Sequence, residues 1–100
     1  MTNKFAVSSA IESIMVASKE RCVTKDELCN PNNMNTVVIM ARAAFYRFCR
    51  EFKIMYDLDI AELFNIDVSM LKLLYGYPLG TTEFIWYNSA MIHYDKLTKK

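Results

Sequence analysis

Two short crossed helices are predicted by the segment DLDIAELFNIDVSMLKLL, residues 57–74. Its apolar side chains fall where such a pair would bury a shared face: Ile60, Phe64, Ile66, Leu71 and Leu74. Ala61 is small enough for the second helix to approach the first, and Asn65 tolerates the left-handed backbone of a tight turn. Asp67 or Ser69 would cap the second helix. We interpret the segment as a helix-turn-helix at about 57–76, with a simple packed corner as the alternative.

Length and composition indicate one helical domain. One hundred residues are enough for a single hydrophobic core, and 53% of them are apolar. Two glycines and two prolines provide few turns, which favours long helices over many short strands. We therefore predict an all-α fold of five to six helices.

The charge balance gives little support for a nucleic-acid partner. Twelve Lys and Arg against eleven Asp and Glu leave a net charge of +1, whereas DNA-binding domains usually carry a clear positive excess. DNA meets a local surface, however, so a basic stripe would be sufficient.

The cysteines and the single histidine indicate neither an enzyme nor a metal site. Cys22, Cys29 and Cys49 are an odd set without a CxxC pair and without a secretory start, which is typical of reduced thiols in a cytoplasmic protein. A zinc site that adds His93 is the alternative, but the spacing matches no usual ligand pattern. No Ser or Cys nucleophile has a plausible base, and no apolar run is long enough to span a membrane. We expect no catalysis, metal, cofactor or membrane partner.

The remaining elements follow from periodicity and turn signals. A helix is predicted over 5–18, and Thr24 with Glu27 forms a capping box that should begin a short helix. An uncharged loop follows over 30–35, and a long helix over about 36–55. After the turn at 76–80, a final helix should reach about residue 97.

The long helix has an apolar face and a basic face. The residues expected in the core repeat at three and four positions: Val37, Ala41, Ala44, Phe45, Phe48 and Phe52. Another face carries three cations and a phenol, Arg42, Tyr46, Arg50 and Lys53, and Arg47 falls outside it. Such a stripe is often only a solvated face. Beside a helix-turn-helix it is also a candidate contact for the DNA backbone.

The order of elements resembles the C-terminal DNA-binding domain of the bacterial chromosomal replication initiator, which has a Trp-repressor-like helix-turn-helix fold. The matching positions are Asp26-Glu27-Leu28, Ala41-Arg42, Arg50-Glu51-Phe52, and Ile60 with Phe64. The resemblance covers most of 5–75, and its ungapped spacing from Ala41 to Phe64 is moderately specific. It implies duplex DNA as the partner. A small, divergent copy standing alone would suit a phage or mobile-element protein.

The sequence departs from this family at the residues that contact DNA. The family's basic minor-groove loop is matched by uncharged Asn32-Asn33-Met34-Asn35, and its Asp-His-Ser/Thr-Thr-Val signature by Asp67-Val68-Ser69-Met70-Leu71. Arg42 is the retained phosphate contact. The resemblance, together with the basic stripe, gives this set of candidate DNA-binding residues: Arg42, Arg50, Lys53, Asp67, Val68, Ser69 and Lys72.

A second register of the signature exists near the C-terminus. Asn88-Ser89-Ala90-Met91-Ile92-His93 is similar to the family's His-Ser-Thr-Val-Ile-His, and adds Asn88, Ser89, His93 and Lys96 as alternative DNA contacts. It requires an insertion of about twenty residues, longer than compact helical connections usually allow. We prefer the first register because it preserves the helix-turn-helix.

Two functions compete at this point. One is sequence-selective duplex DNA binding through residues 67–75. The other is a protein-interaction module that keeps the fold and binds another protein, or itself, through Leu73, Tyr75, Tyr77 and Trp86. The uncharged loop and the balanced charge favour the second function, whereas the resemblance and the arginine stripe favour the first.

Overall fold

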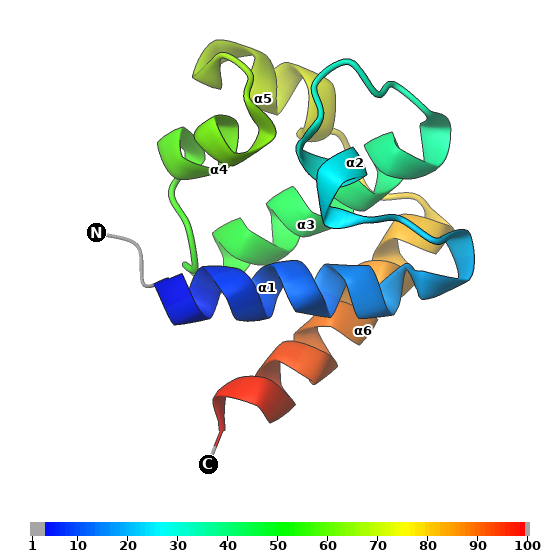
Figure 1. The fold of residues 1–100 in the computed structure, drawn as a ribbon, viewed down its shortest axis with the longest axis vertical. Helices are drawn as coiled ribbons and strands as arrows, with labels where there is room; N and C mark the ends of the chain where they lie inside the picture. Colours follow the sequence, from blue (N-terminus) through cyan, green and yellow to red (C-terminus); the bar gives the residue numbers. More distant parts are fainter. Residues whose placement is uncertain (1–3, 100) are drawn as a thin grey trace.

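The computed structural model describes residues 4–99, which form helices joined by short connections (Figure 1). Six α-helices and one short 3-10 helix, η1, occur in this range: α1 (Lys4–Ala17), η1 (Lys19–Arg21), α2 (Lys25–Cys29), α3 (Thr36–Glu51), α4 (Asp57–Phe64), α5 (Val68–Tyr75) and α6 (Thr81–Thr98). No strand occurs in it, which confirms the predicted all-α fold. None of these helices has the length and apolar character needed to cross a membrane.

Helix α3 is the central element. It packs against α1, α2, α5 and α6, and every residue from Ala41 to Tyr46 is buried. Helices α1 and α6 also pack against each other on one side of α3, while α4 and α5 lie together on the other side (Figure 1). The α4–α5 pair is therefore held at one end of the domain.

Aromatic side chains connect the helix pair to this core. The ring of Phe64 lies 5.9 Å from the ring of Phe45 and 5.4 Å from that of Tyr75, measured between centroids. Phe48 makes a similar edge contact with Tyr94 of α6, at 5.3 Å. Phe45, Phe48, Phe64 and Leu71 are all fully buried in one cluster, as the apolar pattern predicts.

Local capping signals place the ends of two helices. The Thr24 hydroxyl accepts a hydrogen bond from the Glu27 amide at 3.2 Å, and the Glu27 carboxylate accepts one from the Thr24 amide at 3.0 Å. This confirms the predicted capping box at the start of α2. The Asn35 side chain caps α3 by accepting from the Val37 amide at 3.0 Å. The loop before α3 therefore ends where its asparagines predict.

The end of α3 differs from the prediction. The helix stops at Glu51 rather than near residue 55, because Lys53 adopts a left-handed conformation with φ of 55°. The Ile54 amide then bonds to the Cys49 carbonyl at 2.9 Å, and the Lys53 amide to that of Arg50 at 3.2 Å. These bonds form a Schellman motif without its usual glycine. It turns Ile54 into the core, whereas Phe52, predicted to be buried, is 40% exposed.

The buried thiol of Cys49 should make the free energy of unfolding depend on pH in the alkaline range. Burial raises the pKa of its thiol above the ordinary value of 9.0, because the thiolate would lose its hydration in the apolar core. In the unfolded chain the thiol ionises normally, so unfolding releases a proton above about pH 9. This thiol should leave the free energy of unfolding unchanged below that pH. Above it, the free energy should fall by up to about 1.4 kcal/mol per pH unit.

Urea unfolding of the wild type and of Cys49→Ala across this range measures the effect. Between about pH 9 and pH 10, the wild type should lose about 1 kcal/mol more than the variant loses. Cys22 is exposed, so Cys22→Ala is the matched control and should keep the wild-type dependence. Equal pH dependence for the wild type and Cys49→Ala would contradict a buried Cys49.

Candidate nucleic-acid interface

Helices α4 and α5 form the predicted pair, joined by a turn of three residues. Asn65 ends α4 in a left-handed conformation with φ of 58°, as expected from its tolerance of that region. The Asp67 carboxylate caps α5 by accepting a hydrogen bond from the Ser69 amide at 3.2 Å. The sequence therefore predicts both the turn and the cap. The Asp67 carboxylate is used to hold the helix start.

The outer face of α5 is exposed over most of its length. Leu71 and Tyr75 anchor its inner face and are 1% and 3% exposed. Three of the candidate DNA-binding residues, Val68, Ser69 and Lys72, lie on the exposed side together with Met70 and Leu73. Leu73 is the most exposed of the apolar three, at 74%. A partner would meet a mixed surface that bears a hydroxyl, an ammonium and three apolar side chains.

Arg42 is not on the surface, which corrects its assignment as a phosphate contact. Its side chain is among the largest fully buried ones, with 1% exposure. The Nε atom donates to the Leu28 carbonyl at 2.8 Å. The two terminal nitrogens donate to the carbonyls of Glu27, Asn30 and Asn33 and to the hydroxyl of Tyr75. The predicted basic stripe is therefore not a continuous exposed surface, because the Arg42 side chain points into the core.

The buried guanidinium ties three parts of the fold together. Glu27 and Leu28 lie in the last turn of α2, where main-chain oxygens have no partner within the helix. Arg42 bonds to both, to the loop that follows, and through Tyr75 to α5. No ion pair among residues 4–99 includes Arg42, so its charge is held by neutral oxygens. Glu83 is also buried, so the net charge of the remaining residues stays at +1.

The other residues of the predicted basic stripe do not share one exposed face either. Tyr46 is 2% exposed, and Lys53 lies beyond the end of α3, so neither shares an exposed helical face with Arg50. Arg50 is exposed, and its Nε lies 3.2 Å from the Asp57 carboxylate of α4. A terminal nitrogen of Arg50 also donates to the Tyr46 hydroxyl at 3.3 Å. Arg50 thus links α3 to α4 and is already paired with an anion.

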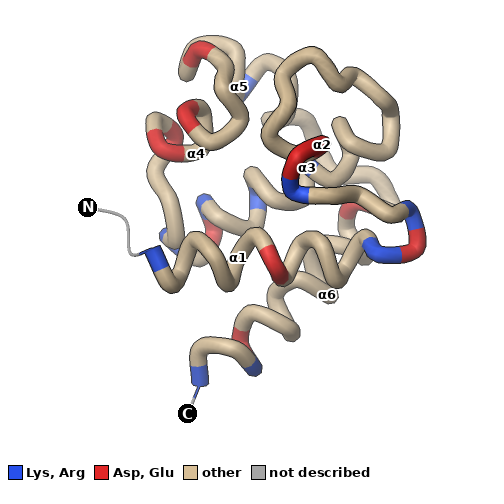
Figure 2. Tube along the Cα trace, in the orientation of Figure 1, with Lys and Arg blue, Asp and Glu red and all other residues tan. Residues whose placement is uncertain are grey.

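A different set of cations comes together beside α5. Arg47 and Arg50 of α3 and Lys72 of α5 line a groove of about 370 Å³, with Tyr46, Glu51 and Gly76. We call this the α3–α5 groove. Sequence reasoning missed Arg47, which falls outside the predicted stripe, because the groove depends on how α3 and α5 cross. Figure 2 shows the contrast with α4, where acidic residues gather at the other end of the pair.

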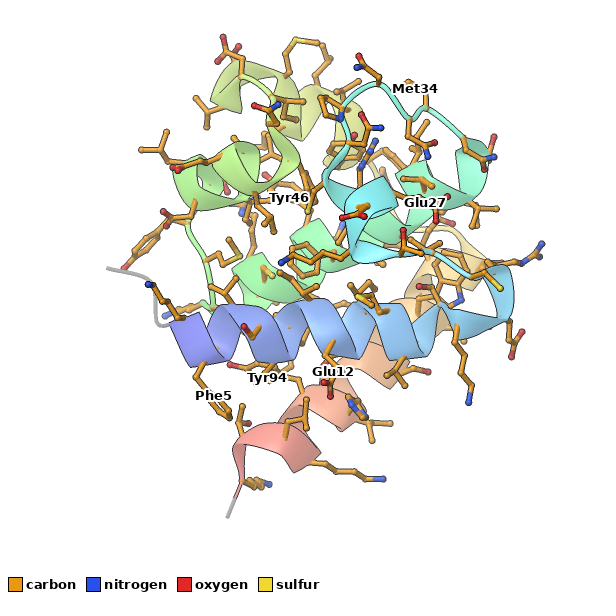
Figure 3. All side chains as sticks on the ribbon, viewed as in Figure 1. Phe5, Glu12, Glu27, Met34, Tyr46 and Tyr94 are labelled. Carbon is orange, nitrogen blue, oxygen red and sulfur yellow. The ribbon has the colours of Figure 1, made fainter. Side chains whose placement is uncertain are left out.

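The second register lies on α6, which packs mainly against α1 and α3. Ser89 and Lys96 are exposed, whereas Asn88 and His93 are partly buried. The His93 Nε2 atom lies 3.3 Å from the carboxylate of Glu12 in α1, which Figure 3 shows on the side of α1 that faces α6. His93 therefore contributes to the contact between two helices. The helix pair and these α6 residues belong to different parts of the fold.

The residues proposed for a protein interface are only partly accessible. Tyr75 and Trp86 are buried, at 3% and 5% exposure, so they are corrected from contact residues to core residues. Tyr77 is partly buried, and Leu73 remains exposed. Leu58 of α4, which was not selected from the sequence, is 67% exposed. An apolar partner would therefore use Leu58 and Leu73.

The cysteines do not assemble with His93. Within residues 4–99, no group of three or more His, Cys, Asp or Glu side chains is placed to hold a metal ion. Cys49 is buried and Cys22 is exposed. The zinc alternative therefore has no support in the described part of the chain.

Comparison of the chain with protein-family models, curated proteins and solved structures finds no match.

Proposed function

We propose that this protein binds duplex DNA, with α5 in the major groove. The observation that carries the proposal is the α4–α5 pair itself. A tight turn joins the two helices, the inner face of α5 is buried, and Val68, Ser69 and Lys72 remain exposed on its outer face. An α-helix is about 10–12 Å across with its side chains, and the major groove is about 12 Å wide and 8.5 Å deep. The helix can therefore enter the groove with these side chains against the base edges.

The exposed side chains have the chemistry to distinguish bases. A serine hydroxyl donates to or accepts from several base edges, and Val68 or Met70 can contact the methyl group of thymine. Lys72 lies one turn after Ser69, where an ammonium can reach a phosphate or guanine. The resemblance to the replication initiator's C-terminal domain supports the same use of this helix. The loss of Arg42 as a contact leaves fewer phosphate-binding residues than that family has.

Charge determines the direction from which DNA would approach. Helix α4 carries Asp57, Asp59 and Glu62, which would repel a phosphate backbone, whereas the α3–α5 groove carries the nearest group of cations. The backbone would therefore run along the α3 side of α5, away from the acidic positions of α4 (Figure 2).

A protein-interaction module is the second candidate, favoured by Leu58 and Leu73. Both leucine side chains are more than half exposed on the helix pair. A bound partner would remove their apolar surface from water, which favours association. The acidic residues of α4 would suit a basic partner. This function would use Leu58 and the acidic residues of α4, together with Leu73 on the outer face of α5.

Selection from random duplexes, followed by titration at physiological salt, tests DNA binding. Ser69→Ala should lose about 1–3 kcal/mol of binding free energy against the selected site and little against random duplex. Ser89→Ala is the matched control because Ser89 is an exposed serine of the other register. If Ser89→Ala alone loses selectivity, α6 rather than α5 contacts the bases.

Failure to bind would favour the second candidate. A wild-type domain that selects no site, and binds random duplex more weakly than about 10⁻⁴ M, falls outside even ordinary non-specific binding. Leu58→Ser and Leu73→Ser would then be the variants to examine for loss of a protein partner.

A further inference from the structure

Two cations of the α3–α5 groove form no ion pair within residues 4–99. Arg50 is paired with Asp57, but no ion pair in the described range includes Arg47 or Lys72. The one carboxylate in the lining is that of Glu51, which accepts a hydrogen bond from the Tyr87 hydroxyl at 3.3 Å. The groove is therefore positive overall and is lined by a guanidinium of α3 and an ammonium of α5.

The position of Lys72 relates the groove to the outer face of α5. Lys72 follows Ser69 by three residues, so their side chains lie on one side of the helix, one turn apart. Gly76 leaves this end of the groove without a side chain. A Cβ at residue 76 would collide with the main-chain oxygen of Lys72 and come within 2.9 Å of its Cγ, so the glycine leaves space for the lysine stem.

We propose that Arg47 and Lys72 hold one phosphate of the DNA backbone between them in the α3–α5 groove. The inference rests on DNA binding through α5 and names the contact that takes the place of Arg42. Arginine presents a planar fork of donors that matches two phosphate oxygens, while lysine acts as a compact point charge. A phosphate fixed one turn from Ser69 would set the register of α5 against the bases, because backbone contacts orient and base contacts specify.

Salt dependence measures this contact directly. Each neutralised phosphate contributes about 0.9 to the slope of log K against log salt concentration, so Arg47→Ala should flatten the slope by about that amount on any duplex. Arg21→Ala is the matched control, since Arg21 is an exposed arginine of η1 outside the groove. Equal slopes for the wild type and Arg47→Ala would overturn the proposal.

Three further variants separate a shared phosphate from general loss of charge. If the phosphate is held only while both cations are present, Lys72→Ala should flatten the slope by about as much as Arg47→Ala does, and the double variant Arg47→Ala/Lys72→Ala by no more than either single change. Additive flattening would overturn a shared contact. Glu51→Gln keeps the acceptor for Tyr87 but removes the negative charge, and should tighten DNA binding several-fold. A misfolded protein would not bind more tightly, so unchanged or weaker binding also counts against the groove.

The experiments can reject the phosphate contact in the groove while DNA binding through α5 stands. They can also reject DNA binding while an anion site in the groove stands. DNA binding with an unchanged slope in Arg47→Ala would retain α5 as the reading helix and remove the groove. If the wild type binds no DNA, titration with inorganic phosphate, followed by nuclear magnetic resonance, tests the groove alone. Shifts centred on Arg47 and Lys72 but absent at Arg21 would keep an anion site there. Their absence would remove it.

Discussion

Replacing Arg42 with leucine is expected to destabilise the domain by about 3–5 kcal/mol. Leucine fills part of the space but provides no donor. The carbonyls of Leu28 and Asn33 and the Tyr75 hydroxyl lose the hydrogen bond that they accept from Arg42, whereas the carbonyls of Glu27 and Asn30 each keep one from a main-chain amide. A buried polar group without a partner costs about 1–3 kcal/mol, and some of these oxygens are near enough to the surface to regain water. The total therefore falls below the sum of five full penalties.

Chemical denaturation of the variant and of Arg50→Leu provides the comparison. Arg50 is an exposed arginine of the same helix, and its ion pair with Asp57 has both side chains more than 40% exposed, so its loss should cost less than about 1 kcal/mol. If Arg42→Leu cost equally little, the guanidinium would be at the surface. It would then again be a candidate for binding phosphate, as the sequence stripe predicts.

Phe64→Ala is expected to cost a similar amount for a different reason. The ring is 1% exposed and lies between Phe45 of α3 and Tyr75 of α5, so truncation leaves a cavity at the junction of three helices. Large-to-small changes of buried phenylalanine cost about 3–5 kcal/mol, through lost burial and incomplete collapse.

Phe84→Ala is the control for the Phe64 measurement. Phe84 of α6 is 53% exposed and stacks only against Tyr87, at 6.1 Å between ring centroids. Its loss should change the free energy of unfolding by less than about 1 kcal/mol. A small effect at both positions would mean that α4 does not pack on α3 as described.

The features predicted from the sequence depend on neighbouring residues. The Thr24 capping box, the left-handed turn at Asn65 and the Asp67 cap each involve residues within a few positions, so local chemistry is sufficient to find them. The core positions Phe45 and Phe64 follow from helical periodicity. This is why the all-α class is confirmed, and why α4 and α5 lie within the segment where two short helices are predicted.

The features that were missed depend on contacts distant in sequence. Arg42 bonds to oxygens 9 to 33 residues away, and a helical stripe gives spacing without showing which face meets solvent. One signal was present. Ala41, Ala43 and Ala44 surround Arg42 with small side chains, which lets neighbouring segments approach the helix closely there. The early end of α3 at Glu51 had no glycine to mark it, because Lys53 takes the left-handed conformation. The placement of Arg47 and Lys72 in one groove depends on how two helices cross.

The way in which Arg42 holds the loop before α3 leaves the exposed positions Asn32 and Met34 free to change, whereas the side chains of Asn30 and Asn33 shape the loop by accepting from main-chain amides. The hydrogen bonds from Arg42 to Asn30 and Asn33 end on main-chain oxygens, which every amino acid supplies alike. Asn32 and Met34 are exposed, and Figure 3 shows Met34 at the outer edge of the loop. Substitutions there can alter the surface while the loop keeps its path. Within one unchanged scaffold, the loop is a site where new recognition residues can be introduced by evolution or by design.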